Sequence, residues 1–165
     1  MIRISGRKAG LAGVLALLFA VMPVAAVGQA QATPFIVAYG HVFNGDSPRC
    51  LDSGTLNGAA LFNCSTSVYQ QWTYTLNGRI IGNSPTGCLD DGAGLDGSRV
   101  FLTTCNGSAS QTWYGIAGGG QFVNAASGRC LDADLGTIGG QGTKVQVWSC
   151  SGGSNQTWRF EFLSS

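Results

Sequence analysis

The sequence has few charged side chains and a single histidine. Asp, Glu, Lys and Arg make up 10% of its 165 residues, and the formal net charge is +1. Because no basic cluster is present to attract phosphate groups, neither nucleic acid nor anionic lipid is an expected partner. His41 has no evident Ser or Asp partner, and no Cys-x2-Cys pair occurs. The sequence therefore predicts no histidine-based catalytic triad, no metal site and no cofactor.

Long apolar runs are also missing, with one exception near the N-terminus. Basic residues precede an apolar stretch over residues 9–27, which is followed by Ala30-Gln31-Ala32. This order is typical of a secretory signal peptide, and we expect residues 1–32 to be removed by cleavage after Ala32. An uncleaved membrane anchor is the alternative, but Pro23 interrupts a run that is already short for crossing a bilayer.

Cleavage would leave residues 33–165, which are enough for one domain with its own core. This part keeps six basic and eight acidic residues, so its net charge would be −2. All six cysteines lie in it, and an even number of cysteines in an exported chain is typical of disulfides. We therefore expect a secreted, extracellular domain that does not insert into membranes.

Apolar residues with a helical period are absent after the N-terminal run. Short alternating segments separated by Gly, Asn, Ser and Pro predict β-strands instead. The first expected strand covers residues 35–39, and a turn is expected at residues 44–48. The predicted fold class is all-β.

Two short motifs each occur three times, in the same order. Cys-Leu-Asp is found at residues 50–52, 88–90 and 130–132, and Gln-x-Trp at residues 70–72, 111–113 and 156–158, with a second cysteine between the motifs in every copy. Such self-similarity indicates a repeat architecture. The predicted repeats cover about residues 35–74, 75–115 and 116–162.

Equivalent repeats imply equivalent disulfides. Six cysteines allow many pairings, but the simplest scheme that treats the repeats alike joins the two cysteines within each repeat. This scheme predicts the disulfides Cys50–Cys64, Cys88–Cys105 and Cys130–Cys150. Loops this short are each expected to add about 3 kcal/mol in the chain-entropy model.

Residues alternate after the tryptophan of the first and third Gln-x-Trp motifs. In Trp72-Thr73-Tyr74 and Trp158-Arg159-Phe160, a period of two places the aromatic rings on one face of a strand. We interpret this face as buried. Trp72, Trp113 and Trp158 are therefore predicted core residues.

Three repeats with Cys-Leu-Asp and Gln-x-Trp resemble the ricin B-chain (R-type) lectin family, which is also found as bacterial xylan- and galactose-binding modules. The resemblance covers essentially residues 35–165. It implies a β-trefoil of twelve strands, with six strands in a short barrel and six in hairpins that cap it. It also implies up to three shallow sugar sites, one per repeat, that need no metal.

The third repeat matches the sugar-contacting positions of that family. In Lys144-Val145-Gln146-Val147-Trp148, the valines are expected to face the core and the other face to point outward. A carboxylate accepts hydrogen bonds from sugar hydroxyls, an amide both donates and accepts them, and an aromatic ring covers the C–H face of a sugar. The resemblance therefore assigns sugar contacts to Asp132, Gln146, Trp148, Asn155 and Gln156.

The other two repeats depart from this pattern. In the middle repeat, Phe101 stands at the amide position, Thr103 at the stacking position and Ser110 where Asn is expected, so we predict a purely structural unit. In the first repeat the corresponding residues are Ala60, Phe62 and Tyr69. The weaker candidate site in the first repeat consists of Asp52, Phe62 and Gln70.

Structural roles compete with sugar binding at several of these positions. The Asp of Cys-Leu-Asp occurs in all three repeats, so part of its role is expected to be holding a turn. Gln70, Gln111 and Gln156 are also common to all repeats and are expected mainly to satisfy buried backbone groups. No other repeat has a tryptophan at the position of Trp148, so an outward ring there favours a ligand platform.

The resulting functional hypothesis is a non-enzymatic, secreted protein that binds galactose, lactose or xylan-like glycans. The acid pairs Asp90-Asp91 and Asp132/Asp134 lie in Gly-rich turns, where solvated acids are more common than a glycosidase pair. The alternative is a protein-binding or receptor-binding subunit of a multi-chain toxin, or an inhibitor, acting through exposed aromatics at Phe62, Tyr69 and Phe101. Which partner chain it would join is left open.

Overall fold

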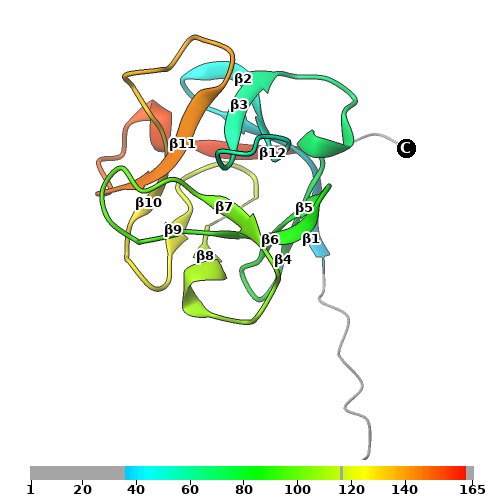
Figure 1. Cartoon of the computed structure of the whole chain (residues 1–165), viewed down its shortest axis with the longest axis vertical. Coiled ribbons are helices and arrows are strands. Elements are labelled where there is room, and N and C mark those ends of the chain that lie inside the picture. Colours follow the sequence, from blue (N-terminus) through cyan, green and yellow to red (C-terminus); the bar gives the residue numbers. More distant parts are fainter. Residues whose placement is uncertain (1–35, 116, 163–165) are drawn as a thin grey trace, which may run out of the picture. The chain divides into compact units, whose positions relative to one another are not determined.

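The computed structural model describes residues 36–115 and 117–162 (Figure 1). Residues 1–32, the expected signal peptide, lie outside these ranges. Within them, no helix is long and apolar enough to cross a membrane. The strands are β1 Ile36–Asn44, β2 Ser47–Asp52, β3 Ala60–Asn63, β4 Trp72–Thr75, β5 Ile80–Asn83, β6 Thr86–Asp90, β7 Phe101–Thr103, β8 Trp113–Tyr114, β9 Val123–Asn124, β10 Cys130–Ala133, β11 Thr143–Trp148 and β12 Trp158–Phe162. Short 3₁₀ helices precede β4, β8 and β12, at η1 Val68–Gln70, η2 Ala109–Gln111 and η3 Ser154–Gln156.

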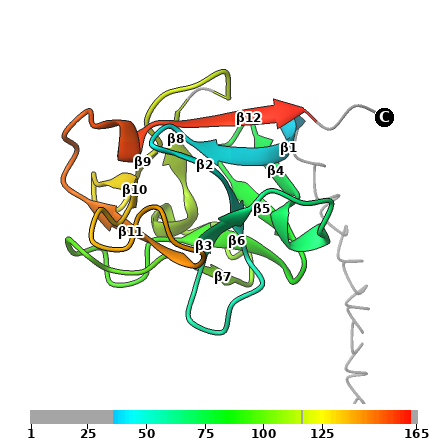
Figure 2. The ribbon, with the colours of Figure 1, turned by 90° about the horizontal axis from the view of Figure 1, so that it is seen from above.

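The first strand is longer than the sequence predicts. It continues past Tyr39 to Asn44, and the turn that follows is shorter than expected, because Ser47 and Pro48 already belong to β2. The extension is stabilised by pairing on two sides, since it pairs with β12 from Gly40 to Asn44 and with β2 at Phe43 and Asn44. Figure 2 shows β12 running beside β1.

Six strands form the barrel expected of a β-trefoil. β12, β1, β4 and β5 are paired in that order, and β8 pairs with β9. The two groups are joined where the backbone N–H of Trp113 donates to the carbonyl of Gly78 at 2.8 Å and where Gly120 bridges to Trp158. The all-β prediction is confirmed.

The remaining six strands form three hairpins, β2–β3, β6–β7 and β10–β11, which are labelled in Figure 1. Three backbone hydrogen bonds link the hairpins in a closed ring. The N–H of Ala59 donates to the carbonyl of Val100 at 2.9 Å, Val100 donates to Val145 at 3.3 Å, and Val145 donates back to Ala59 at 3.3 Å. The ring places the three repeats around one pseudo-threefold axis.

The three motif tryptophans are buried, as predicted, with no exposed surface. Each indole N–H donates to the carbonyl of the leucine in the Cys-Leu-Asp motif of its own repeat. These bonds join Trp72 to Leu51 at 2.8 Å, Trp113 to Leu89 at 2.8 Å and Trp158 to Leu131 at 2.9 Å. The two sequence motifs are therefore the two ends of one contact, which a buried indole N–H requires.

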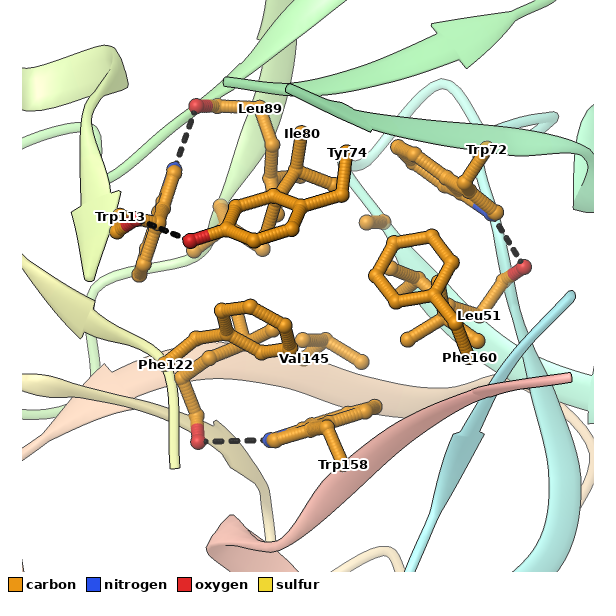
Figure 3. Packing of buried hydrophobic residues seen from close by; sticks show 14 of the residues in the cluster. Leu51, Trp72, Tyr74, Ile80, Leu89, Trp113, Phe122, Val145, Trp158 and Phe160 are labelled. Atoms are coloured by element: carbon orange, nitrogen blue, oxygen red, sulfur yellow. Dashed lines mark hydrogen bonds between the residues drawn. The ribbon is translucent and has the colours of Figure 1, made fainter. Parts of the chain in front are cut away.

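The centre of the core is filled by aromatic rings whose positions break the threefold symmetry. Tyr74 and Phe160 occupy the second position after their tryptophans, but the middle repeat has Gly115 there. A Cβ on Gly115 would lie 2.4 Å from the ring of Phe122, so glycine leaves space for this ring. Figure 3 shows the rings of Tyr74, Phe122 and Phe160 surrounded by those of Trp72, Trp113 and Trp158.

All three predicted disulfides are confirmed. Cys50 is bonded to Cys64, Cys88 to Cys105 and Cys130 to Cys150, with Cα–Cα distances of 5.0, 5.0 and 5.1 Å. Each disulfide joins the first strand of a hairpin to the chain just after its second strand. The hairpins that carry the candidate site positions are therefore closed covalently.

Candidate functional site

The third hairpin brings together the residues that the sequence singles out. In β10–β11, Asp132 is paired with Gln146 and Cys130 with Trp148, so these side chains project from one face of the hairpin. Val145 and Val147 project from the other face and are fully buried, as predicted. Trp148 remains 44% exposed, which confirms that its ring points outward.

The carboxylate of Asp132 is held by three side-chain amides. Gln146 donates from Nε2 to Oδ1 at 2.9 Å, whereas Asn155 donates from Nδ2 to Oδ2 at 2.8 Å and Gln156 from Nε2 to Oδ2 at 2.9 Å. A carboxylate has about four lone-pair positions. Three of these are occupied, so one acceptor position, on Oδ1, is left for a ligand hydroxyl.

The environment of Asp132 acts on its pKa in two directions. Burial raises the pKa of the Asp132 carboxyl above its usual value, and the nearby charge of Asp134 adds a smaller rise. The hydrogen bonds from Gln146, Gln156 and Asn155 oppose this rise because they stabilise the ionised form. Since burial is the larger effect, the net shift is upward.

A cavity of about 450 Å³ lies over this carboxylate and contains all five predicted site residues in its wall. The sequence reasoning did not place Asp134 and Leu135 here, although their position directly after the Cys-Leu-Asp motif could have suggested it. The remaining wall residues are Ser149, Cys150 and Ser151. The structure therefore brings the predicted residues together, and their role in binding stays a prediction.

Two of these residues are less accessible than expected. Asp132 and Gln146 were predicted to point outward, but each is only 3% exposed. They do lie on the outer face of the hairpin, where their hydrogen bond to each other and the covering side chain of Asn155 remove them from water. Only the edge of the polar group is open to the cavity.

Gln156 has the structural role that was expected of the glutamine in every repeat. Its Nε2 donates to the carbonyl of Ser149 at 3.0 Å, and its Oε1 accepts the backbone N–H of Ser151 at 2.8 Å. Gln70 and Gln111 are buried and make the same pair of backbone bonds in their own repeats. The bond to Asp132 is therefore an addition to a clamp that holds the loop after the second cysteine.

The aspartate of the third repeat differs from its two counterparts. Asp52 accepts the backbone N–H of Gly54 at 2.7 Å, and Asp90 accepts that of Gly92 at 3.0 Å, so both hold the turn that follows them, as predicted. For Asp132 the turn prediction is wrong. Its turn is held instead by Asp134, which accepts the N–H of Gly136 at 3.3 Å.

The middle repeat has no aromatic ring at the stacking position. Phe101 is paired with Asp90 and Thr103 with Cys88, so they stand where Gln146 and Trp148 stand in the third hairpin, as the count from the second cysteine assigns them. The hydroxyl of Ser110 donates to Oδ2 of Asp90 at 3.2 Å. The carboxylate is thus occupied by short side chains of its own repeat.

The first repeat is altered by Tyr69, whose ring packs on the turn after Asp52. A Cβ on Gly54 would lie 2.9 Å from Cγ of Tyr69. Gln70 donates to Oδ2 of Asp52 at 3.0 Å, and Phe62 is half-buried. The cavity nearby, of about 250 Å³, is lined by Tyr69 and Phe101 and includes neither Asp52 nor Phe62. Sugar binding by Asp52, Phe62 and Gln70 stays a prediction.

Comparison with known proteins shows which family this chain resembles. The model of the ricin-type beta-trefoil lectin domain matches residues 38–158. A curated relative, probable alpha-galactosidase A of Aspergillus niger, is 33% identical over 109 residues, which make up 64% of this chain and 19% of that protein. The chain therefore spans about a fifth of the length of this relative.

Two solved structures show the same fold. The designed 3-fold symmetric protein ThreeFoil is 27% identical with a TM-score of 0.66, and the match covers 76% of this chain and 99% of that one. The hemolytic lectin CEL-III is also 27% identical with a TM-score of 0.66, over 80% of this chain and 32% of that one.

Proposed function

Because the chain belongs to the family of ricin-type β-trefoil lectin domains, we propose that it is a secreted carbohydrate-binding protein that recognises galactose-type or xylan-like glycans, mainly through its third repeat. One observation carries the proposal. An exposed indole, that of Trp148, lines the same cavity as a carboxylate that three amides hold in place, that of Asp132.

The polar half of this site suits a pair of sugar hydroxyls. The free acceptor position on Oδ1 of Asp132 would accept a hydrogen bond from one sugar hydroxyl. The side-chain oxygens of Gln146 and Asn155 would accept hydrogen bonds from others. The amides lie ready-made around the carboxylate, so little side-chain ordering is needed when a ligand arrives.

The apolar half suits the C–H face of a sugar ring. Trp148 supplies the flat surface, and Leu135, which is 63% exposed, extends the apolar wall of the cavity. The name of the fungal relative, an alpha-galactosidase, supports galactose-type ligands. A single shallow site of this kind is expected to bind with a Kd of about 10 μM to 1 mM.

The site is better suited to binding than to glycoside hydrolysis. Asp132 is almost fully buried, and three of its acceptor positions are occupied by amide N–H donors, so little of the carboxyl group can reach a glycosidic oxygen. Asp134 uses its oxygens on its own loop, through Gly136 and the hydroxyl of Thr137 at 3.0 Å. We therefore propose a non-catalytic role, which release of reducing sugar from a bound glycan would contradict.

The test is calorimetric titration of the chain from Thr33 onward with lactose, galactose and xylan oligosaccharides. Trp148→Ala and Asp132→Ala are each expected to reduce binding below detection while the fold is kept. Phe101→Ala is the matched control, because Phe101 is an exposed aromatic on the equivalent strand of the middle repeat. Undiminished binding in both site variants would rule out the third-repeat site.

Secretion rests on the order of basic, apolar and small residues before Thr33. Mass spectrometry of protein recovered outside the producing cell is expected to find Thr33 at the N-terminus. Recovery of the intact chain from membranes alone would contradict this half of the proposal.

A second candidate function, protein binding within a toxin or inhibitor complex, is favoured by one feature. Tyr69, 43% exposed, and Phe101, 39% exposed, share the cavity between the first and middle repeats with the fully exposed Leu56. A glycan array without any hit, together with retention of one specific protein that Tyr69→Ala and Phe101→Ala release, would select this function instead.

A further inference from the structure

The middle repeat, which lacks a complete site of its own, reaches across to the third hairpin. The loop after β6 places Asp96 beside Ser149, the residue directly after Trp148. Oδ1 of Asp96 accepts the backbone N–H of Ser149 at 2.8 Å, and Oδ2 accepts its hydroxyl at 2.9 Å. Asp96 also forms a 2.7 Å ion pair with Nε of Arg129, which precedes Cys130.

The same loop holds the residue on the other side of Trp148. Gly97 donates its backbone N–H to the carbonyl of Val147 at 2.9 Å, and Val147 donates to the carbonyl of Ser98 at 2.8 Å. Gly97 has a φ of +84°, and a Cβ built on it would lie 3.5 Å from Cζ3 of Trp148. The indole therefore lies against the Gly97 backbone, and the residues before and after it are both fixed by the middle repeat.

We propose that Asp96 is a positioning residue for Trp148, so that the binding site is completed across the boundary between the middle and third repeats. The inference rests on the proposed function, because it concerns the ring that would stack on the sugar. A stacking ring that is already held in place loses less conformational freedom when the ligand binds, and this raises affinity. Asp96 itself does not line the cavity.

The first hairpin shows the same contact with a neutral partner. Oε1 of Gln141 accepts the backbone N–H of Asn63 at 3.0 Å, and Gly142 donates to the carbonyl of Leu61 at 2.9 Å. A Cβ on Gly142 would lie 3.5 Å from Cζ of Phe62, the counterpart of Trp148.

The two junctions differ in charge. At the third hairpin the acceptor is a carboxylate that Arg129 also binds, and these contacts lower the pKa of Asp96, so that it stays ionised in mild acid. Charge-assisted bonds are shorter and stronger than neutral ones. The better fixed of the two rings is thus the one in the complete site.

The test combines affinity with a signal from the ring itself. Trp72, Trp113 and Trp158 are fully buried, so acrylamide quenching reports mainly on Trp148. Asp96→Ala is expected to weaken binding of the responsive glycan roughly tenfold and to raise the quenching constant, with the unfolding midpoint little changed. Asp96→Asn keeps an acceptor for Ser149 but loses the charge, so its effects are expected to be smaller.

Gln141→Ala is the control, since it removes the equivalent contact beside Phe62 and is expected to leave both readouts unchanged. If Trp148→Ala abolishes binding but Asp96→Ala changes neither affinity nor quenching, the positioning role is overturned while the proposed function stands. If neither Trp148→Ala nor Asp132→Ala weakens glycan binding, the proposed third-repeat site fails. The quenching of Asp96→Ala then tests the positioning role by itself, and an unchanged quenching constant overturns it.

Discussion

Among single residues, Asp132 carries the chemistry of the proposed site. In its counterparts Asp52 and Asp90, one carboxylate oxygen accepts a backbone N–H of the turn that follows. Asp132 is instead oriented by side chains from β11 and η3. Backbone donors would tie the carboxylate to its loop. The amides instead hold it beside Trp148, with one acceptor position open to the cavity.

This environment makes glycan affinity dependent on pH. A sugar hydroxyl needs the ionised carboxylate as acceptor, and burial raises the pKa of Asp132. Affinity is therefore expected to be full above the raised pKa and to fall as the pH drops through it, beginning at a higher pH than for an ordinary aspartate with a pKa of about 3.9. Titrations from about pH 7 to about pH 4 would measure this dependence.

The fold should survive this acidification. Because the folded pKa of Asp132 is above the unfolded one, the folded state binds the proton more tightly, and protonation of this residue adds stability as the pH falls. Circular dichroism is therefore expected to stay constant while affinity declines. Asp132→Asn should remove the dependence on pH along with most of the affinity, and an affinity that changes only when the protein unfolds would contradict the prediction.

The strand face of the site residues could be predicted from the sequence, but their partners and their burial could not. Strand periodicity correctly places Gln146 and Trp148 on the face opposite the buried valines, whereas the pairing of Asp132 with Gln146 is seen only in the structure. Whether an aspartate holds its own turn depends on which donors reach it in space. In the third repeat this turn is held by Asp134, and no local pattern reveals the exchange.

At the scale of elements, the β2–β3 and β10–β11 hairpins share one register but differ in what they present. Asp52 faces Ala60 where Asp132 faces Gln146, and Phe62 stands where Trp148 does. The main obstacle in the first repeat is the ring of Tyr69, which packs on Gly54 beside the carboxylate. The first hairpin therefore has the register of the third, with Ala60 in place of the amide and Phe62 in place of the indole.

A second site should appear when these side chains are supplied. The combined substitutions Ala60→Gln, Phe62→Trp and Tyr69→Asn are expected to raise the calorimetric stoichiometry from one ligand to two. The added site should be the weaker, because Oδ1 of Asp52 remains bonded to the N–H of Gly54 at 2.7 Å. The variant that keeps Tyr69 is the control and should still bind one ligand. A stoichiometry of one in the triple variant would show that the hairpin register does not define the site.

Strand ends were the least predictable feature at this scale. The local pattern of β1 suggests a strand that ends at Tyr39, yet pairing with β12 continues it to Asn44. The side chain of Asn44 donates to the carbonyl of Asn155 at 2.8 Å, which fixes the end of the strand. Both partners lie more than a hundred residues away in sequence, so the local signal could not contain them.

In the molecule as a whole, the repeats depend on one another. The Cys-Leu-Asp and Gln-x-Trp motifs reveal what each repeat does internally, since Trp72 donates to Leu51 within the first repeat and its counterparts do the same. No sequence motif marks the contacts between repeats. Neither the ring through Ala59, Val100 and Val145 nor the contact of Asp96 with Ser149 could be predicted from the sequence, because each joins backbone groups or unlike residues across repeats.

This dependence predicts how the protein responds to loss of one disulfide. The bonds close loops with sequence separations of 14, 17 and 20 residues, and each is expected to add about 3 kcal/mol. The loop-length term changes by only about 0.3 kcal/mol across this range. Replacing either the Cys50–Cys64 or the Cys130–Cys150 pair by serines should therefore cost nearly the same free energy of unfolding.

Because the hydrogen-bonded ring couples the hairpins, each such variant should still unfold in one cooperative transition rather than lose a single repeat. Urea denaturation followed by both fluorescence and circular dichroism would measure this, with coincident curves from the two probes as the expected result. Curves that separate in the Cys130–Cys150 variant would mean that the third repeat opens alone. In that case the contact of Asp96 with the chain beside Trp148 would be too weak to keep the site assembled without its covalent closure.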